Sequence, residues 1–129
     1  MEETNKRGWW IPGGAVEAAE TFQQAATREC WEEAGVHIKL RGILKIERFI
    51  QGEDKFKMRV IFYAEPRNPD NCTPKQTADQ ESNGAEWVTQ EEFKQKEKIR
   101  GDELLIFAEY LEKKGLENAV FPLEMFEDE

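Results

Sequence analysis

The stretch from residue 21 to residue 34 contains neither glycine nor proline, and it constrains the fold of this chain more than any other part. Apolar side chains recur in it every four residues, at Phe22, Ala26, Cys30 and Ala34. This recurrence places them on one face of an α-helix, and Gly35 is well placed to end that helix. The sequence therefore predicts a helix over 21–34 that packs one face against the rest of the protein.

Strand-like runs follow the predicted helix. Apolar and polar residues alternate over 36–40, and two further runs, 43–50 and 56–65, are separated by the polar segment 51–55. This pattern predicts a short strand and then a hairpin. The run 56–65 is apolar on both faces, which is typical of a strand covered from both sides. We therefore expect helices above and below the sheet.

Further short strands are predicted at both ends of this region. Residues 9–11 form a short apolar run that turn residues interrupt, and 85–88 is a similar run after the polar loop 66–84. A loop of that length inside a compact domain is usually functional or mobile.

Two helices are predicted in the last third of the chain. Thr89 and Glu92 have the spacing of a capping box, which opens a short helix through about Lys96. Asp102 is suited to cap a second helix that Gly115 closes. The mixture of helices and strands in this order predicts an α+β layered domain.

Length and charge narrow the class of protein. The chain has 129 residues, which fits one domain over 1–129, with an acidic tail at 124–129. It has 27 acidic and 18 basic side chains, and this excess disfavours polymeric nucleic acid or an anionic membrane as a partner. No apolar stretch is long enough to span a bilayer. Two cysteines are too few for a disulfide scaffold and suggest a reducing compartment, so we expect a cytoplasmic protein.

Three glutamates on the predicted helix indicate a metal site. Glu29, Glu32 and Glu33 are spaced so that their carboxylates share one side of the helix, where they repel one another. A divalent cation removes that repulsion, and carboxylate oxygens are ligands that Mg²⁺ or Mn²⁺ prefers. A solvated acidic helix face is the alternative for these three residues taken alone.

The residues around the glutamates support the metal interpretation. Arg28 lies four positions before Glu32 and is able to orient one carboxylate while leaving the metal side free. Gly13 and Gly14 allow the backbone to approach a ligand closely, and Glu20 precedes the helix, where its dipole favours negative charge.

The complete spacing resembles the box of the Nudix hydrolases, whose pattern is G-x5-E-x7-R-E-U-x-E-E-x-G-U with U a bulky aliphatic residue. In this chain Gly14 and Glu20 have that spacing from the run Arg28-Glu29-Cys30-Trp31-Glu32-Glu33-Ala34-Gly35-Val36. All the fixed letters match, and Cys30 at the first U position is a mild departure that is still apolar enough to pack. A match of this length is far more specific than a lone glycine motif.

The resemblance implies an α/β/α sandwich with a mixed sheet and a Mg²⁺-dependent or Mn²⁺-dependent hydrolase of nucleoside diphosphates linked to another group. By this likeness Glu29 and Glu33 are the principal metal ligands, Glu32 a further one, and the carbonyl of Gly14 adds a backbone ligand. The remaining box residues, Glu20, Arg28 and Gly35, support the loop and helix. The implied chemistry is in-line attack of water on phosphorus.

A general base outside the box is also implied, because some Nudix enzymes use a glutamate from a later loop, just before a segment that contains tryptophan. Here Glu81 precedes the Glu86-Trp87 pair and fits that place best, while Glu32 and Glu33 are the catalytic candidates inside the box. An ordinary exposed loop carboxylate is an equally good interpretation of Glu81.

The order of three further segments, 59–66, 78–88 and 99–105, is similar to the Nudix branch that acts on oxidised guanine nucleotides. In that light Trp9 and Trp10 are candidates to stack on a base, although on a strand at most one of them faces the site. Arg59 is a candidate for contact with substrate phosphates, with a solvent-facing role as the alternative.

The resemblance also implies strands ahead of the box, and in this sequence only residues 9–11 are suited to form one. An uncovered sheet edge favours pairing with another chain, so we expect a homodimer or reduced stability. Three functions are consistent with the sequence. The first is a nucleoside diphosphate hydrolase, the second a diphosphoinositol or dinucleoside polyphosphate hydrolase, and the third a catalytically weak nucleotide-binding module.

Overall fold

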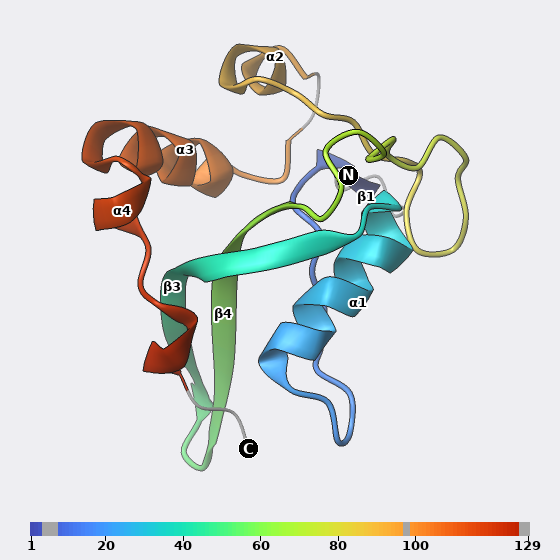
Figure 1. The fold of residues 1–129 in the computed structure, drawn as a ribbon. Coiled ribbons are helices and arrows are strands. Elements are labelled where there is room, and N and C mark those ends of the chain that lie inside the picture. Colours follow the sequence, from blue (N-terminus) through green and yellow to red (C-terminus); the bar gives the residue numbers. More distant parts are fainter. Residues whose placement is uncertain (4–7, 97–98, 127–129) are drawn as a thin grey trace.

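A long antiparallel hairpin forms the centre of the molecule (Figure 1). The computed structural model describes residues 1–3, 8–96 and 99–126. In it β3 (Ile38–Gly52) pairs with β4 (Lys55–Pro66), from Ile38 opposite Pro66 to Gly52 opposite Lys55. The predicted hairpin is confirmed. The runs expected as separate strands at 36–40 and 43–50 form one continuous strand. Its pairing with β4 continues across residues 40–45, where the register shifts twice.

Helix α1 (Phe22–Ala34) begins and ends where the sequence predicted. The Thr21 side chain accepts a hydrogen bond from the backbone of Gln24, whose own side chain accepts one from the backbone of Thr21. Gly35 ends the helix with φ at 70°, a left-handed conformation that glycine adopts without the cost of a Cβ atom.

The remaining helices lie in the last third of the chain. They are α2 (Gln90–Lys94), α3 (Glu103–Lys114), α4 (Leu116–Ala119) and the 3₁₀ turn η1 (Leu123–Met125). The predicted capping box at Thr89 is confirmed, and Gly115 ends α3 as expected. Asp102 occupies the position before α3, but its side chain makes no capping hydrogen bond with the described residues.

A small second sheet lies at the N-terminal end, where β1 (Glu2–Glu3) pairs antiparallel with β2 (Gly8–Trp9). The expectation that only 9–11 could form a strand ahead of the box was therefore wrong, because 2–3 also pairs. The prediction of a strand at 85–88 was wrong as well. Those residues pair with no strand in the described part of the chain, and only the preceding Gly84 forms a single bridge, to Glu2.

Helices lie on both sides of the hairpin, with α1 on one side and α3 and α4 on the other (Figure 1). The core between these layers contains buried apolar side chains, among them Ala25, Val36, Ile43, Ile61, Phe107 and Ala119. Phe121, which follows α4, bonds through its backbone to Ile43 of β3, and this contact holds the C-terminal helices against the hairpin. The α+β class predicted from the sequence is confirmed.

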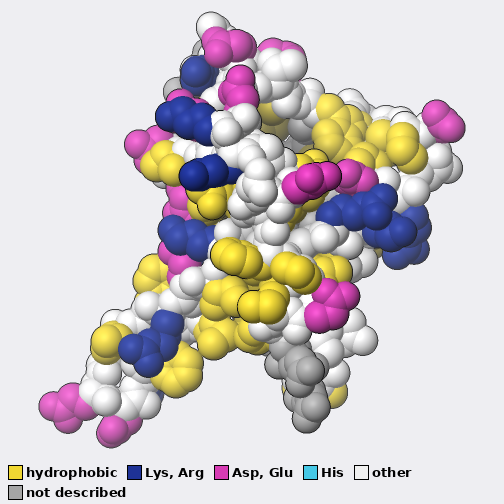
Figure 2. Space-filling model, turned by 60° about the vertical axis from the view of Figure 1, so that its left-hand side comes forward, with side chains coloured by type: hydrophobic (Ala, Val, Ile, Leu, Met, Phe, Trp, Pro, Cys, Tyr) yellow, Lys and Arg dark blue, Asp and Glu magenta, His cyan; other side chains and the backbone are white. Residues whose placement is uncertain are grey.

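The far end of the hairpin projects from the body (Figure 2). Ile50 and Phe56 face each other across the two strands there and are 76% and 60% exposed. Within the described residues β4 pairs only with β3, so its other edge is free of strand partners. The predicted homodimer stays a prediction. No helix of the described chain is long and apolar enough to cross a membrane.

Candidate active site

The loop before α1 folds back onto the helix and contacts two of the three glutamates predicted as metal ligands. Glu33 is only 8% exposed, and its carboxylate accepts a hydrogen bond of 2.7 Å from the backbone N–H of Gly13. A bond between residues so far apart in sequence holds the loop over the C-terminal half of the helix. It also fixes the direction in which Glu33 points.

Gly14 touches the carboxylate of Glu29. A Cβ atom built on Gly14 would lie 2.7 Å from Cδ of Glu29 and 3.0 Å from its Oε2, too close for any residue but glycine unless the carboxylate moves. The neighbouring Gly13 has nothing within 4 Å of the corresponding position. Gly14, unlike Gly13, therefore has a carboxylate at the place where a side chain would begin.

Arg28 joins the loop to the helix. Its Nε and Nη2 atoms donate to the two oxygens of Glu20 at 2.8 and 3.1 Å, and Nη2 also donates to the carbonyl of Ala15 at 3.1 Å. The hydrogen bonds from Arg28 lower the pKa of the Glu20 carboxyl, and those to Glu20 raise the pKa of Arg28. A paired guanidinium and carboxylate of this geometry holds both partners in fixed orientations.

The same guanidinium lies between two candidate metal ligands. Arg28 Nη1 is 3.0 Å from Oε1 of Glu29 and 3.0 Å from Oε2 of Glu32. The expectation that Arg28 orients one carboxylate and leaves the metal side free was therefore wrong, because its guanidinium lies between two of the predicted ligands. The three carboxylates do not converge as expected from their spacing, because Glu33 is held separately by Gly13. In the described residues, no group of three or more His, Cys, Asp or Glu side chains is arranged to hold a metal ion.

The donor chemistry nevertheless fits a hard divalent cation. The carboxylates of Glu29 and Glu32 lie close together, since an oxygen of each is 3.0 Å from the same nitrogen of Arg28. Gly14 lies beside the Glu29 carboxylate, so its backbone is close to one of these ligands. Oxygen atoms of this kind, completed by water and phosphate, are what Mg²⁺ prefers.

A cavity of about 960 Å³ opens beside these groups, between α1, the preceding loop and β4. Six of the predicted site residues line it: Trp10, Gly14, Glu29, Glu33, Arg59 and Glu81. Glu32, Glu20, Arg28, Gly35 and Trp9 do not line it. The cavity is large enough for a nucleotide.

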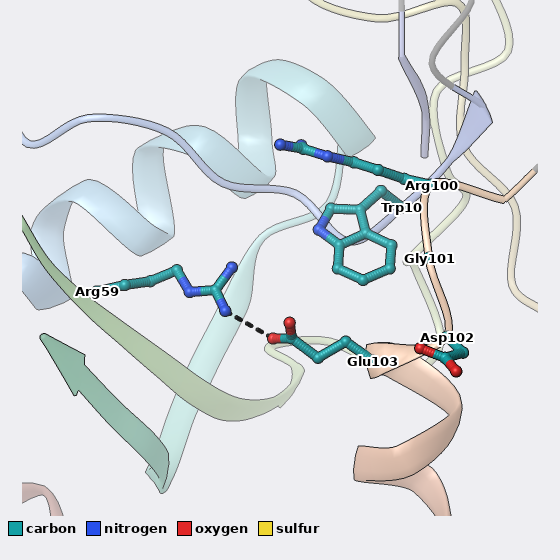
Figure 3. Close-up of a pocket in the computed structure, with 6 residues that line it drawn as sticks. All are labelled: Trp10, Arg59, Arg100, Gly101, Asp102 and Glu103. Atoms are coloured by element: carbon teal, nitrogen blue, oxygen red, sulfur yellow. Dashed lines mark hydrogen bonds and ion pairs between the residues drawn. The ribbon is translucent and has the colours of Figure 1, made fainter. Parts of the chain in front are cut away.

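A second cavity of about 310 Å³ adjoins the first, because both are lined by Trp10, Arg59 and Arg100. Figure 3 shows Arg59 reaching from β4 toward Glu103 at the start of α3, with Trp10 and Arg100 beside them. Arg59 Nη2 donates to Glu103 at 2.7 Å, and Arg59 Nε donates to Glu47 of β3 at 2.8 Å. Burial lowers the pKa of Arg59, but these hydrogen bonds and charges raise it overall. Arg59 therefore links β3, β4 and α3, with its side chain 35% exposed.

Trp9 and Trp10 differ in surroundings, although only Trp9 belongs to strand β2. Trp10 lines both cavities, and Arg100 lies over its ring at 6.0 Å from the centroid. Trp9 lines neither, and the ammonium of Lys96 lies 4.1 Å from the centroid of its ring. Of Trp9 and Trp10, it is thus Trp10 that a ligand bound in either cavity can reach.

Several residues that the sequence did not single out also contribute to the site. Trp87 lines the larger cavity, is 55% exposed, and donates from its indole to the carbonyl of Cys72 at 2.7 Å. Lys75 and Ser82 bond to the end of α1 from the loop after β4. Nothing in the sequence around Lys75 or Ser82 indicates these contacts, since they join residues more than 40 positions apart.

Cys30 also lines the larger cavity. Burial, with a smaller contribution from the charge of Glu33, raises the pKa of its thiol to about 11. The thiol therefore stays neutral at physiological pH and adds no further negative charge beside the glutamates.

Comparison with known proteins gives the same family as the box. The model of the NUDIX domain matches residues 2–109. The chain is also similar to the protein named Phosphatase NudJ from Escherichia coli (strain K12), from Escherichia coli O157:H7 and from Shigella flexneri. Each is 31% identical over 102 residues, which cover 78% of this chain. The chain spans 65% of the length of these relatives.

Proposed function

The chain belongs to the NUDIX domain family, and from that membership we propose that it is a divalent-metal-dependent hydrolase of a nucleoside diphosphate or its derivative. The observation that carries the proposal is the pair of contacts between loop and helix. Gly13 holds the buried carboxylate of Glu33, and Gly14 lies against that of Glu29, at the wall of a cavity large enough for a nucleotide.

The proposed metal ligands are Glu29, Glu33, Glu32 and the carbonyl of Gly14, and the proposed ion is Mg²⁺ or Mn²⁺. When bound, such an ion lowers the pKa of a water molecule and neutralises charge on the phosphate oxygens. Arg28 and Glu20 keep the loop and helix in register, and Gly35 ends the helix after the last ligand.

Glu81 is the proposed general base. It lines the same cavity as Glu29 and Glu33, so its carboxylate can accept the proton that the attacking water loses. The water oxygen forms a bond to phosphorus as the bond to the leaving oxygen breaks, and the leaving group departs with its electron pair. Glu33, which is more buried, is the second candidate for the base.

The substrate is proposed to place a heteroaromatic ring against Trp10, consistent with oxidised guanine nucleotides. Trp10 lies where the two cavities meet, and stacking on such a ring is favourable for any nucleobase. The smaller cavity contains two arginines and two carboxylates, Asp102 and Glu103, so its charge is balanced and its hydrogen-bonding groups are of both kinds. A ring with donor and acceptor edges fits this lining better than another phosphate.

That balance disfavours the second function, a diphosphoinositol or dinucleoside polyphosphate hydrolase. Those substrates carry dense negative charge, and Arg59 is already paired with Glu47 and Glu103. The third function, a catalytically weak nucleotide-binding module, retains the same contacts but lacks turnover. A cytoplasmic location stays a prediction.

A panel of diphosphate substrates, assayed with Mg²⁺ for released phosphate or nucleoside monophosphate, tests the proposal. Wild type is expected to hydrolyse at least one nucleotide, and Glu33→Gln is expected to lose about 100-fold or more of that activity. Glu91→Gln, an exposed glutamate on α2, is the matched control and should behave as wild type. If wild type and Glu33→Gln bind nucleotide and are equally inactive, the hydrolase assignment fails and the binding module stands.

A further inference from the structure

The loop between β4 and α2 caps the end of α1 that carries the catalytic glutamates. The carbonyls of the last three helical residues each accept a hydrogen bond from this loop. Lys75 Nζ donates to the carbonyl of Glu32 at 2.7 Å, and the Lys75 backbone N–H donates to that of Ala34 at 2.8 Å. Ser82 Oγ donates to the carbonyl of Glu33 at 2.6 Å. A helix leaves its last carbonyls without partners inside the helix, so these bonds complete it.

The Ser82 contact is enclosed by the protein. Ser82 has no exposed surface, so water cannot replace its hydroxyl at the Glu33 carbonyl. Lys75 places its ammonium at the C-terminal end of the helix, where the helix dipole favours positive charge. The Lys75 carbonyl also accepts the backbone N–H of Ala85, which closes the loop upon itself.

One carboxylate orders the part of this loop that contains Glu81. Asp79 Oδ1 accepts the backbone N–H of Glu81 at 2.8 Å and that of Ser82 at 3.2 Å. The Asp79 backbone N–H in turn donates to the carbonyl of Ser82 at 2.9 Å. Lys75 forms an ion pair with the other Asp79 oxygen. These bonds fix the turn at both ends. Glu81 lies next to Ser82, which bonds to the carbonyl of Glu33.

We propose that Ser82 and Asp79 are positioning residues that couple Glu81 in the loop to Glu33 at the end of α1. The inference rests on the proposed function, in which Glu33 is a metal ligand and Glu81 the base. Ser82 holds the backbone of Glu33, and Asp79 holds the backbones of Ser82 and Glu81. The two carboxylates belong to segments nearly fifty residues apart, yet only a few hydrogen bonds separate their backbones.

Substitutions at Ser82 and Asp79 are expected to have different effects. Loss of the Ser82 hydroxyl leaves the Glu33 carbonyl buried without that donor and loosens the last turn of the helix. This should weaken metal binding. Loss of the Asp79 acceptor releases the turn that presents Glu81 but leaves the Ser82 contact to the helix available. This should slow the reaction without changing metal affinity.

Ser82→Ala, Asp79→Ala and Asp79→Asn test the coupling, with Thr77→Ala as a matched control. Thr77 is exposed in the same loop and makes no hydrogen bond with the described residues. The Mn²⁺ dissociation constant is measured by electron paramagnetic resonance, and kcat and KM are measured on the best substrate. Ser82→Ala should weaken Mn²⁺ binding about 10-fold, and Asp79→Ala should lower kcat about 10-fold at unchanged Mn²⁺ affinity. Asp79→Asn should recover most of that kcat, because an amide oxygen can accept the same two N–H groups.

The opposite results overturn the proposal. It fails if Ser82→Ala and Asp79→Ala match Thr77→Ala in both measurements, or if Asp79→Asn is as slow as Asp79→Ala. Should Ser82→Ala not fold, Lys75→Met removes the ammonium contact to the same helix end, and unchanged Mn²⁺ affinity in that variant counts against the coupling. If wild type hydrolyses nothing, the proposed function fails separately. In that case the Mn²⁺ dissociation constants of the variants, and the hydrogen-exchange rates of the Lys75 and Ala85 backbone amides, still show whether the loop holds the end of α1.

Discussion

Arg28 donates two hydrogen bonds to the carboxylate of Glu20, from Nε at 2.8 Å and from Nη2 at 3.1 Å. The pair joins the loop that carries Gly13 and Gly14 to the helix that carries the glutamates. The arginine therefore performs two tasks, since its remaining nitrogen lies between Glu29 and Glu32. Two-point geometry of this kind belongs to the planar guanidinium, and lysine cannot reproduce it.

Arg28→Lys is expected to weaken Mn²⁺ binding and to lower hydrolysis by about 10-fold, because the loop and helix lose their two-point connection. Arg41→Lys is the matched control, since Arg41 makes a single exposed ion pair with Glu65. Mn²⁺ titration and initial rates check the prediction. Equal behaviour of the two variants would show that a positive charge at position 28 is sufficient.

Gly14→Ala is expected to lower metal affinity by about 10-fold while leaving the melting temperature close to that of wild type. The atoms nearest the added Cβ belong to the Glu29 carboxylate, which is the flexible end of a side chain, so the fold can accommodate it. Gly13→Ala places its Cβ in open space and serves as the control. A loss of affinity in Gly13→Ala as large as that in Gly14→Ala would argue against the contact with Glu29.

Trp10→Ala should raise the KM for a nucleotide about 10-fold with little change in kcat, since stacking contributes to binding rather than to the chemical step. Trp9→Ala should instead lower the free energy of unfolding by about 2 kcal/mol, because its half-buried ring lies outside both cavities. Steady-state kinetics and urea unfolding of both variants separate the two effects. An unchanged KM in Trp10→Ala would remove Trp10 from the substrate site.

Stability at acidic pH should depend on the pair of Glu47 and Arg59. Burial raises the pKa of the Glu47 carboxyl, but hydrogen bonds and charge from Arg59 hold it below the ordinary value of 4.5. A depressed pKa contributes stability that is present above pH 4.5 and is lost as the pH falls through the folded value.

Arg59→Gln tests this dependence. At neutral pH it should lower the free energy of unfolding by about 1 kcal/mol, and the difference from wild type should shrink as the pH falls below the ordinary carboxyl range. Urea unfolding of wild type and Arg59→Gln, repeated from neutral pH down to the lowest pH at which both still fold, measures this difference in the free energy of unfolding. A constant difference over that range would assign the effect to packing of Arg59 instead.

The features that could be predicted from the sequence are those that depend on local patterns. The start of α1 at Thr21, its end at Gly35 and the capping box at Thr89 depend on neighbours within a few residues, so short-range spacing predicts them. The hairpin follows from alternation in the same way. The strand expected at 85–88 is not observed because strand pairing needs a partner, and a short apolar run does not supply one.

The sequence by itself determined the family, the helix that carries Glu29, Glu32 and Glu33, and the glycines beside it, because these depend on spacing along one segment. Only the tertiary structure decided which tryptophan faces a cavity, which glycine touches a carboxylate, and where the last carbonyls of α1 find their partners. It also placed Arg28 between two carboxylates. Contacts such as that of Ser82 with Glu33 join distant segments, so they depend on how the whole chain packs and not on local spacing.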